Sequence, residues 1–113
     1  MSDFAGYLQR MGGLHDAEVA GVAWRPSEGS LEIRLDDVYA NFRGLPEYPG
    51  LESGSIVFSG VGALEMSLEH AERLRIYEIT AGDDGAASVA FSPAGRVSLR
   101  FGEASYPPCR LRG

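Results

Sequence analysis

The 113-residue chain is 44% hydrophobic and 23% charged, a composition typical of one globular domain spanning residues 1–113. Its 16 acidic residues against 10 basic ones give a net charge of −6, which argues against nucleic-acid or anionic-membrane binding because both depend on a basic surface. Every basic residue is an arginine, so catalysis by a lysine side chain is excluded.

The expected location follows from three observations. No apolar run approaches the roughly 20 residues of a membrane span. The first residues lack the basic start and apolar stretch of a signal peptide. The single cysteine, Cys109, cannot form a disulfide within the chain. We therefore expect a cytoplasmic protein that does not enter a membrane.

The N-terminal segment has the apolar spacing of a short helix. Phe4, Tyr7, Leu8 and Met11 fall on one helical stripe. Asp3 is placed to cap the helix and the following pair of glycines to end it. Such a short helix needs to pack on the rest of the domain to be stable.

His15 and Asp16 stand side by side where the first strand is expected to begin. On a regular strand adjacent side chains point to opposite faces, so His15 would face inward and Asp16 outward. A catalytic His–Asp pair needs hydrogen-bond distance, which this geometry forbids. We therefore interpret the two residues as a polar strand start without a catalytic role.

The next residues predict a β-hairpin. Leu31, Ile33 and Leu35 alternate with polar residues, as on a half-buried strand. The preceding strand, over residues 17–24, alternates only if its phase slips once at Ala20-Gly21, which predicts a β-bulge. Residues 26–30 supply the turn.

Residues 38–54 form a long segment with no strand or helix period. Asp37 precedes the segment, and Tyr39, Asn41, Phe42 and Tyr48 lie within it. We take all five as candidate binding residues. Two interpretations stay open: the aromatic side chains pack over an open end of the sheet, or the segment is a binding loop.

Further strands are predicted over residues 55–58, 64–68 and 73–80, and a hairpin over 89–101. A helix beginning at Ala71 competes with the third of these strands. Gly82–Gly85 is predicted to turn, and the tail with Pro107-Pro108 to leave the sheet. The fold class is therefore mainly β: an antiparallel sheet of about six strands, curled into a barrel or split into a sandwich, with one N-terminal helix.

No cofactor or metal site is predicted. Glu69, His70 and Glu72 lie in one expected turn, with too few soft ligands for structural zinc. Asp37, Asn41 and Glu47 lack the spacing of a calcium loop. A metal-dependent hydrolase using His15, Asp16 and His70 stays open as an alternative, since it requires only that the two histidines meet in space.

The segment Gly13-Leu14-His15-Asp16-Ala17, followed by the hairpin that ends at Leu31–Asp37, resembles small bacterial proteins of unassigned function. Some of these are proposed immunity proteins encoded beside polymorphic toxins. The resemblance covers about the first third of the chain. It implies a β-rich cytoplasmic protein that acts by binding.

We therefore predict a non-catalytic protein-interaction module that meets a basic partner with its acidic surface and the loop of residues 38–54. Neutralisation of a toxin is one instance. A small-ligand-binding domain with the aromatic loop as a lid is a second alternative. A homodimer through an unpaired edge strand also stays open, because no sequence feature selects it.

Overall fold

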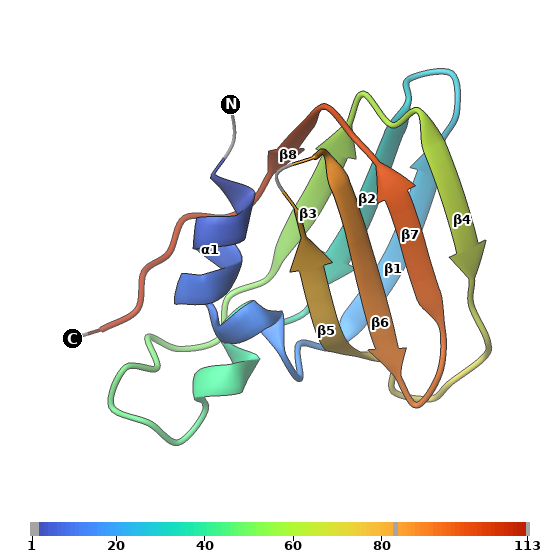
Figure 1. Cartoon of the computed structure of the whole chain (residues 1–113). Helices are drawn as coiled ribbons and strands as arrows, with labels where there is room; N and C mark the ends of the chain where they lie inside the picture. Colours follow the sequence, from blue (N-terminus) through green and yellow to red (C-terminus); the bar gives the residue numbers. More distant parts are fainter. Residues whose placement is uncertain (1–2, 83, 113) are drawn as a thin grey trace.

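In the described part of the chain, eight β-strands form two four-stranded antiparallel sheets that face each other across a shared core (Figure 1). The computed structural model describes residues 3–82 and 84–112. One sheet has the strand order β1-β2-β3-β8 and the other β4-β7-β6-β5. The strands are β1 Val19–Arg25, β2 Ser30–Leu35, β3 Gly54–Ser59, β4 Ala63–Ser67, β5 Arg75–Ala81, β6 Ala86–Ser92, β7 Arg96–Arg100 and β8 Glu103–Ser105.

The core lies between the sheets, because alternating side chains of each strand point inward. In β2 the pattern is strict: Leu31, Ile33 and Leu35 are buried, while Arg34 is exposed. The other buried apolar side chains of the strands are Ile56, Phe58, Ile76, Ile79, Ala87, Val89, Phe91, Val97, Leu99 and Ala104.

The chain crosses from one sheet to the other just before β1. The N–H of Val19 bonds to the carbonyl of Leu74 at 2.7 Å, and the N–H of Ile76 bonds to that of Ala17 at 2.9 Å, so this segment pairs with the start of β5. Pairing with β2 begins at Val19, whose partner is Leu35, and continues from Gly21 after a register shift between Val19 and Gly21. The predicted β-bulge is confirmed, and it lies where the chain changes sheets.

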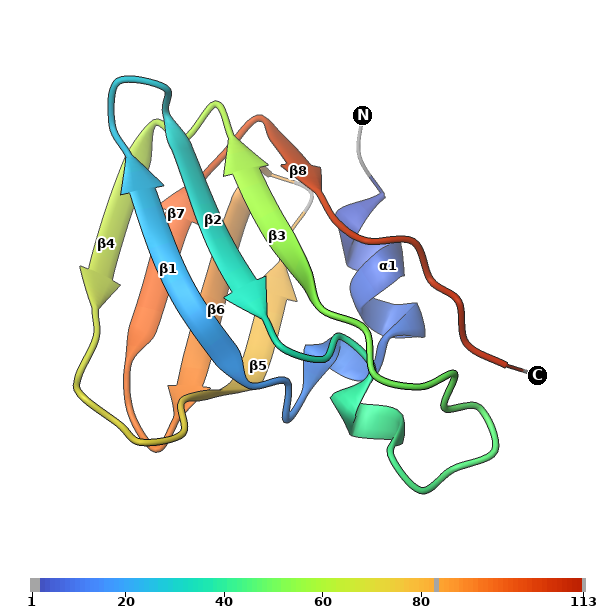
Figure 2. The same ribbon diagram turned by 180° about the vertical axis from the view of Figure 1, so that it is seen from behind.

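Helix α1, Phe4–Arg10, closes one side of the space between the sheets, opposite β1 and β4 (Figures 1 and 2). The Phe4 ring meets Phe58 of β3 edge-on, with centroids 5.4 Å apart. Tyr7 stacks on Tyr106 of the C-terminal tail at 4.1 Å. The helix is thus stabilised by aromatic packing that a short isolated helix lacks.

The predicted helix and the mainly antiparallel β class are confirmed. β5 confirms a strand where a helix from Ala71 was the alternative.

The predicted count of about six strands is wrong, and so is the barrel, because the two sheets do not close on each other. β8 was not predicted from the sequence, because a strand of three residues is too short to show an alternating pattern. The tail leaves the sheet as predicted. The predicted turn at Gly82–Gly85 includes residue 83, which lies outside the described residues.

Candidate functional site

Residues 38–52 form a closed loop on the same side of the molecule as α1 and the C-terminal tail (Figure 2). Its two ends meet at a neck, where the N–H of Val38 bonds to the carbonyl of Glu52 at 2.9 Å. Inside the loop, 3₁₀ turn η2, Ala40–Phe42, is followed by further turns. A compact surface loop with touching ends is an Ω-loop, and such loops frequently carry function. We call residues 38–52 the Ω-loop.

Asp37, which immediately precedes the Ω-loop, is the one fully buried charged side chain among the described residues. Its Oδ1 accepts the N–H groups of Tyr39 at 3.1 Å and Glu52 at 3.2 Å. Its Oδ2 accepts the hydroxyl of Tyr48 at 2.7 Å and Nε of Arg43 at 3.2 Å. One carboxylate therefore binds donors from both ends and the middle of the loop.

These donors determine the charge state of Asp37. Burial on its own raises the pKa of the carboxyl group. The hydrogen bonds from Tyr48, from the two backbone N–H groups and from Arg43 outweigh burial, so the pKa lies below its ordinary value. Asp37 is consequently ionised at neutral pH, and the same hydrogen bond raises the pKa of the Tyr48 hydroxyl. This is the pattern of a structural anchor, because every ionised oxygen is already satisfied.

Tyr39 ties the C-terminal tail to the Ω-loop. Its buried hydroxyl donates to the carbonyl of Pro108 at 3.0 Å and accepts the N–H of Arg110 at 2.8 Å. Burial raises the pKa of this hydroxyl, so it stays neutral and able to donate. The N–H of Arg112 bonds to the carbonyl of Glu47 at 2.8 Å. The tail thus lies along the loop and braces it.

The structure brings together three of the predicted binding residues, Asp37, Tyr39 and Tyr48, as the internal frame of the Ω-loop. Asn41 and Phe42 are half-buried beside Gly12 of the N-terminal turn. A ligand therefore meets little of these side chains.

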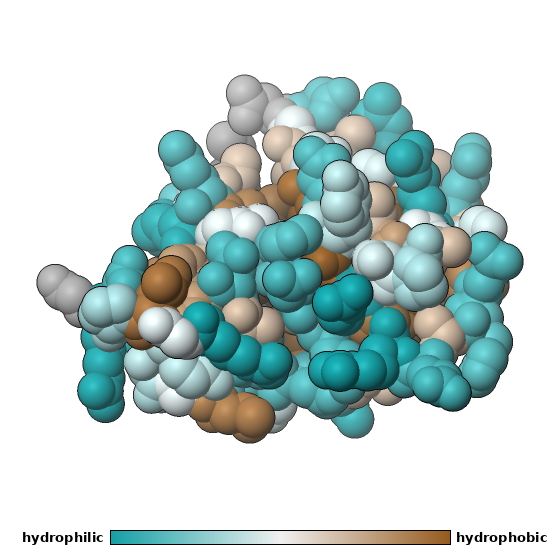
Figure 3. All heavy atoms as spheres, turned by 90° about the horizontal axis from the view of Figure 1, so that it is seen from below, coloured by the Kyte–Doolittle hydropathy of each residue, from teal (hydrophilic) through white to brown (hydrophobic). Residues whose placement is uncertain are grey.

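Two exposed side chains of the Ω-loop were missed in the sequence. Leu45 is 49% and Leu51 is 75% exposed. Figure 3 shows hydrophobic spheres among hydrophilic ones on the side of the molecule where the Ω-loop lies. Their signal in the sequence was weak, since a leucine outside any period gives no indication of burial or exposure.

The predicted strand geometry of His15 and Asp16 is wrong. They follow the 3₁₀ turn η1, Gly12–Leu14, and the strand begins only at Val19. The backbone is left-handed at Leu14, with φ 56°, and at Asp16, with φ 68°. This turn places Nε2 of His15 3.5 Å from Oδ1 of Asp16, so the two side chains do not diverge.

His15 joins the N-terminal turn to β5. Its Nδ1 lies 2.8 Å from the carbonyl of Tyr77, where β5 carries a register shift, and is placed to donate its hydrogen there. A hollow of about 450 Å³ lies beside His15.

His70, the second histidine, is exposed in the connection between β4 and β5. Across residues 3–82 and 84–112, no three His, Cys, Asp or Glu side chains are grouped so as to hold a metal ion.

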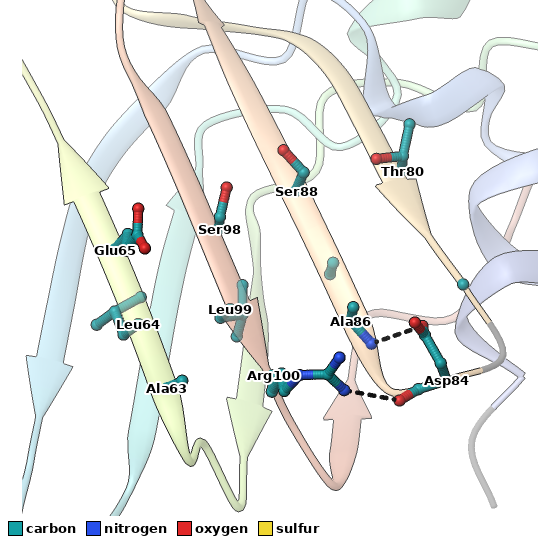
Figure 4. A pocket seen from close by; sticks show the side chains of 12 residues that line it. Ala63, Leu64, Glu65, Thr80, Asp84, Ala86, Ser88, Ser98, Leu99 and Arg100 are labelled. Atoms are coloured by element: carbon teal, nitrogen blue, oxygen red, sulfur yellow. Dashed lines mark hydrogen bonds between the residues drawn. The ribbon is translucent and has the colours of Figure 1, made fainter.

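A second hollow, of about 480 Å³, lies on the outer face of the β4-β7-β6-β5 sheet (Figure 4). Glu65, Ser98, Ser88 and Thr80 are successive register partners and cross the four strands in one row. At its rim Asp84 accepts the N–H of Ala86 at 3.2 Å through its carboxylate. No residue of the Ω-loop lines either of these hollows, so the loop is a lid over neither.

The chain matches no protein-family model, no curated protein and no solved structure. Within the described part of the chain, no helix has both the length and the apolar character needed to cross a membrane. The predicted relationship to immunity proteins remains a prediction.

Proposed function

We propose that this chain is a non-catalytic protein-interaction module that inserts its Ω-loop into a partner. The observation that carries the proposal is the exposure of Leu51, 75%, beside a neck fixed by the buried Asp37 carboxylate. Burying an exposed leucine in a partner contributes about 1.5–3 kcal/mol. A loop that is already ordered loses little conformational entropy when it binds, so more of this free energy contributes to affinity.

The partner implied by this surface offers an apolar pocket for Leu51 and Leu45. Around them, the exposed Arg43 and Arg110 and the half-buried Glu47 supply a polar rim of both signs. The net charge of −6 favours a basic partner by electrostatic steering. Neutralisation of a basic toxin, which the resemblance of residues 13–37 implies, is one instance of such binding.

The test uses affinity capture from an extract of the producing organism, with three variants compared with the wild type. Leu51→Ser and Leu45→Ser remove exposed contacts of the Ω-loop. Tyr77→Ser is the matched control, because it removes an exposed apolar side chain, 59% exposed, from β5. We expect the wild type and the control to retain one stoichiometric protein, and Leu51→Ser to lose it.

Two outcomes contradict the proposal. One is that no stoichiometric protein is retained by the wild type. The other is that Leu51→Ser and Leu45→Ser retain the same protein as strongly as Tyr77→Ser does. The latter would place the interaction on another surface.

Small-ligand binding is the second candidate, favoured by the hollow of about 480 Å³ on the outer sheet face. Its row of hydroxyls, Thr80, Ser88 and Ser98, next to the Glu65 carboxylate suits a small polar molecule. NMR titration with a library of small polar metabolites tests it. Saturable shifts of the Ser88 and Ser98 amides that vanish in Glu65→Ala support it, and unmoved amides throughout contradict it.

A further inference from the structure

The two sheets have four edge strands. β1 carries a bulge at its start, between Val19 and Gly21, and then pairs unbroken with β2 from Gly21 to Arg25. β5 carries a register shift within the strand, between Ile76 and Glu78. β8 is only three residues long. Bulges and short strands are the usual means by which proteins prevent edge pairing. β4 has neither: its register with β7 runs unbroken from Ala63 to Ser67.

β4 is also the most exposed of these strands. Four of its five residues are exposed, and only Leu64 is half-buried. Met66 is 42% exposed, and Leu68, which directly follows the strand, is 40% exposed. Both are apolar side chains on the inward-facing row, where a neighbouring strand would cover them.

We propose that β4 pairs in antiparallel fashion with β4 of a second copy of this chain, joining two sheets into one. In an antiparallel pair, directly opposite side chains point to the same face of the sheet. In a symmetric dimer the two-fold axis must therefore pass beside one residue of β4, which then lies opposite its own copy in the second chain. Centred on Met66, the pairing sets Met66 opposite its own copy and Leu64 opposite Leu68. On the outer face Glu65 then faces Ser67.

The neighbouring register is disfavoured by charge. Centred on Glu65, it would place two identical carboxylates directly opposite each other, which is destabilising in an antiparallel pair. The register centred on Met66 avoids this and covers the exposed apolar row. The sequence of β4 is therefore self-complementary when the pairing is centred on Met66.

The position of β4 leaves the Ω-loop free. β4 lies on the side of the molecule away from α1 and the Ω-loop (Figures 1 and 2). A dimer formed there presents two Ω-loops outward. The contact is small, so we expect a dissociation constant in the range of about 10 µM to 1 mM. Because each chain carries a charge of −6, added salt strengthens the dimer by screening repulsion.

Sedimentation equilibrium over about 10 µM to 1 mM measures this association. We expect the apparent mass of the wild type to rise with concentration toward twice that of one chain, more steeply at higher salt. Met66→Lys should weaken dimerisation at least about tenfold, since it places a charge in the apolar row. Tyr77→Lys is the matched control on a different edge and should dimerise like the wild type.

Oxidative cross-linking tests the register in a Cys109→Ser background, which removes the native exposed thiol. Directly opposed residues bring their Cβ atoms to about 4.5–5.5 Å, near disulfide distance. Met66→Cys should therefore cross-link and Glu65→Cys should not. The proposal is overturned by a wild type that stays monomeric throughout the range, by a Met66→Lys variant that dimerises normally, or by more efficient cross-linking at position 65 than at 66.

Discussion

The two sheets and the Ω-loop differ in how their stabilisation is distributed. Buried apolar side chains from six of the described strands share the stabilisation of the sheets, with Phe58, Ile33 and Val97 among the most buried. In the Ω-loop one carboxylate, that of Asp37, accepts four hydrogen bonds that join both ends and the middle of the loop, and the bonds to the tail only add to this anchor. The loop should therefore open through a change at one residue while the sheets stay folded.

The largest expected effect lies in the sheets. Phe58→Ala should reduce the free energy of unfolding by about 3–5 kcal/mol, because it leaves a cavity beside Phe4 and Phe101. Urea unfolding at pH 7 and pH 3 measures it. A loss of similar size at both pH values is expected, since no charge is removed, and a loss that vanishes at pH 3 would contradict apolar packing as its source.

Asp37→Asn should reduce the free energy of unfolding by about 2–3 kcal/mol at pH 7, since the amide nitrogen cannot accept the hydrogen bonds that the carboxylate oxygen accepts. The pKa of Asp37 is lower in the folded chain than its ordinary value of about 3.9. Its contribution is therefore complete above that value and is lost as the pH falls through the folded-state pKa.

The difference between wild type and Asp37→Asn, measured by urea unfolding from pH 7 down to pH 3, should thus shrink below about pH 4. Comparing the two proteins cancels the carboxyl groups that they share, such as Glu18 and Glu32. A difference that stays constant to pH 3 would show that the ionised carboxylate is not the anchor.

Tyr39→Phe is expected to cost about 1 kcal/mol, because the two groups released in the tail regain hydrogen bonds to water. The tail should loosen, and trypsin should cleave after Arg110 faster than in the wild type. Mass spectrometry of timed digests measures the rate. Unchanged cleavage would mean that the hydroxyl of Tyr39 does not hold the tail.

Tyr7→Phe also removes a tyrosine hydroxyl, but we expect no loss of stability from it. Among the described residues the Tyr7 hydroxyl is buried without a hydrogen-bond partner, and its burial raises the pKa of the group. Removing it should leave the free energy of unfolding unchanged or raise it by up to about 1 kcal/mol. Thermal unfolding of Tyr7→Phe, measured in parallel with Tyr39→Phe and the wild type, tests this. A clear loss of stability in Tyr7→Phe would reveal a hydrogen-bond partner for the Tyr7 hydroxyl.

Sequence alone predicted the sheets far better than the Ω-loop, for a physical reason. Strand alternation such as Leu31, Ile33 and Leu35 directly reflects which face is buried. The bulge at Ala20-Gly21 was visible as a slip in that period. The pairing of β3 with β8 was not, because it joins distant segments and one is too short to show alternation.

The anchor role of Asp37 has no sequence signature, since two of its donors are backbone N–H groups brought close only by folding. Asp37, Tyr39 and Tyr48 were chosen as binding candidates, and the structure gives them inward roles. The left-handed turn at Asp16 was missed because a strand was assumed from the residues that follow. The preceding Gly12-Gly13 pair and the tolerance of aspartate for positive φ were the available signals.

Backbone order in Asp37→Asn, measured by ¹⁵N relaxation at pH 7, tests most directly whether one carboxylate holds the Ω-loop independently of the sheets. We predict that order parameters for residues 39–52 fall below about 0.6 while those of β2, β3 and β6 stay near 0.85. Loop values that stay equal to those of the sheets, or sheet values that fall together with the loop, would contradict this account.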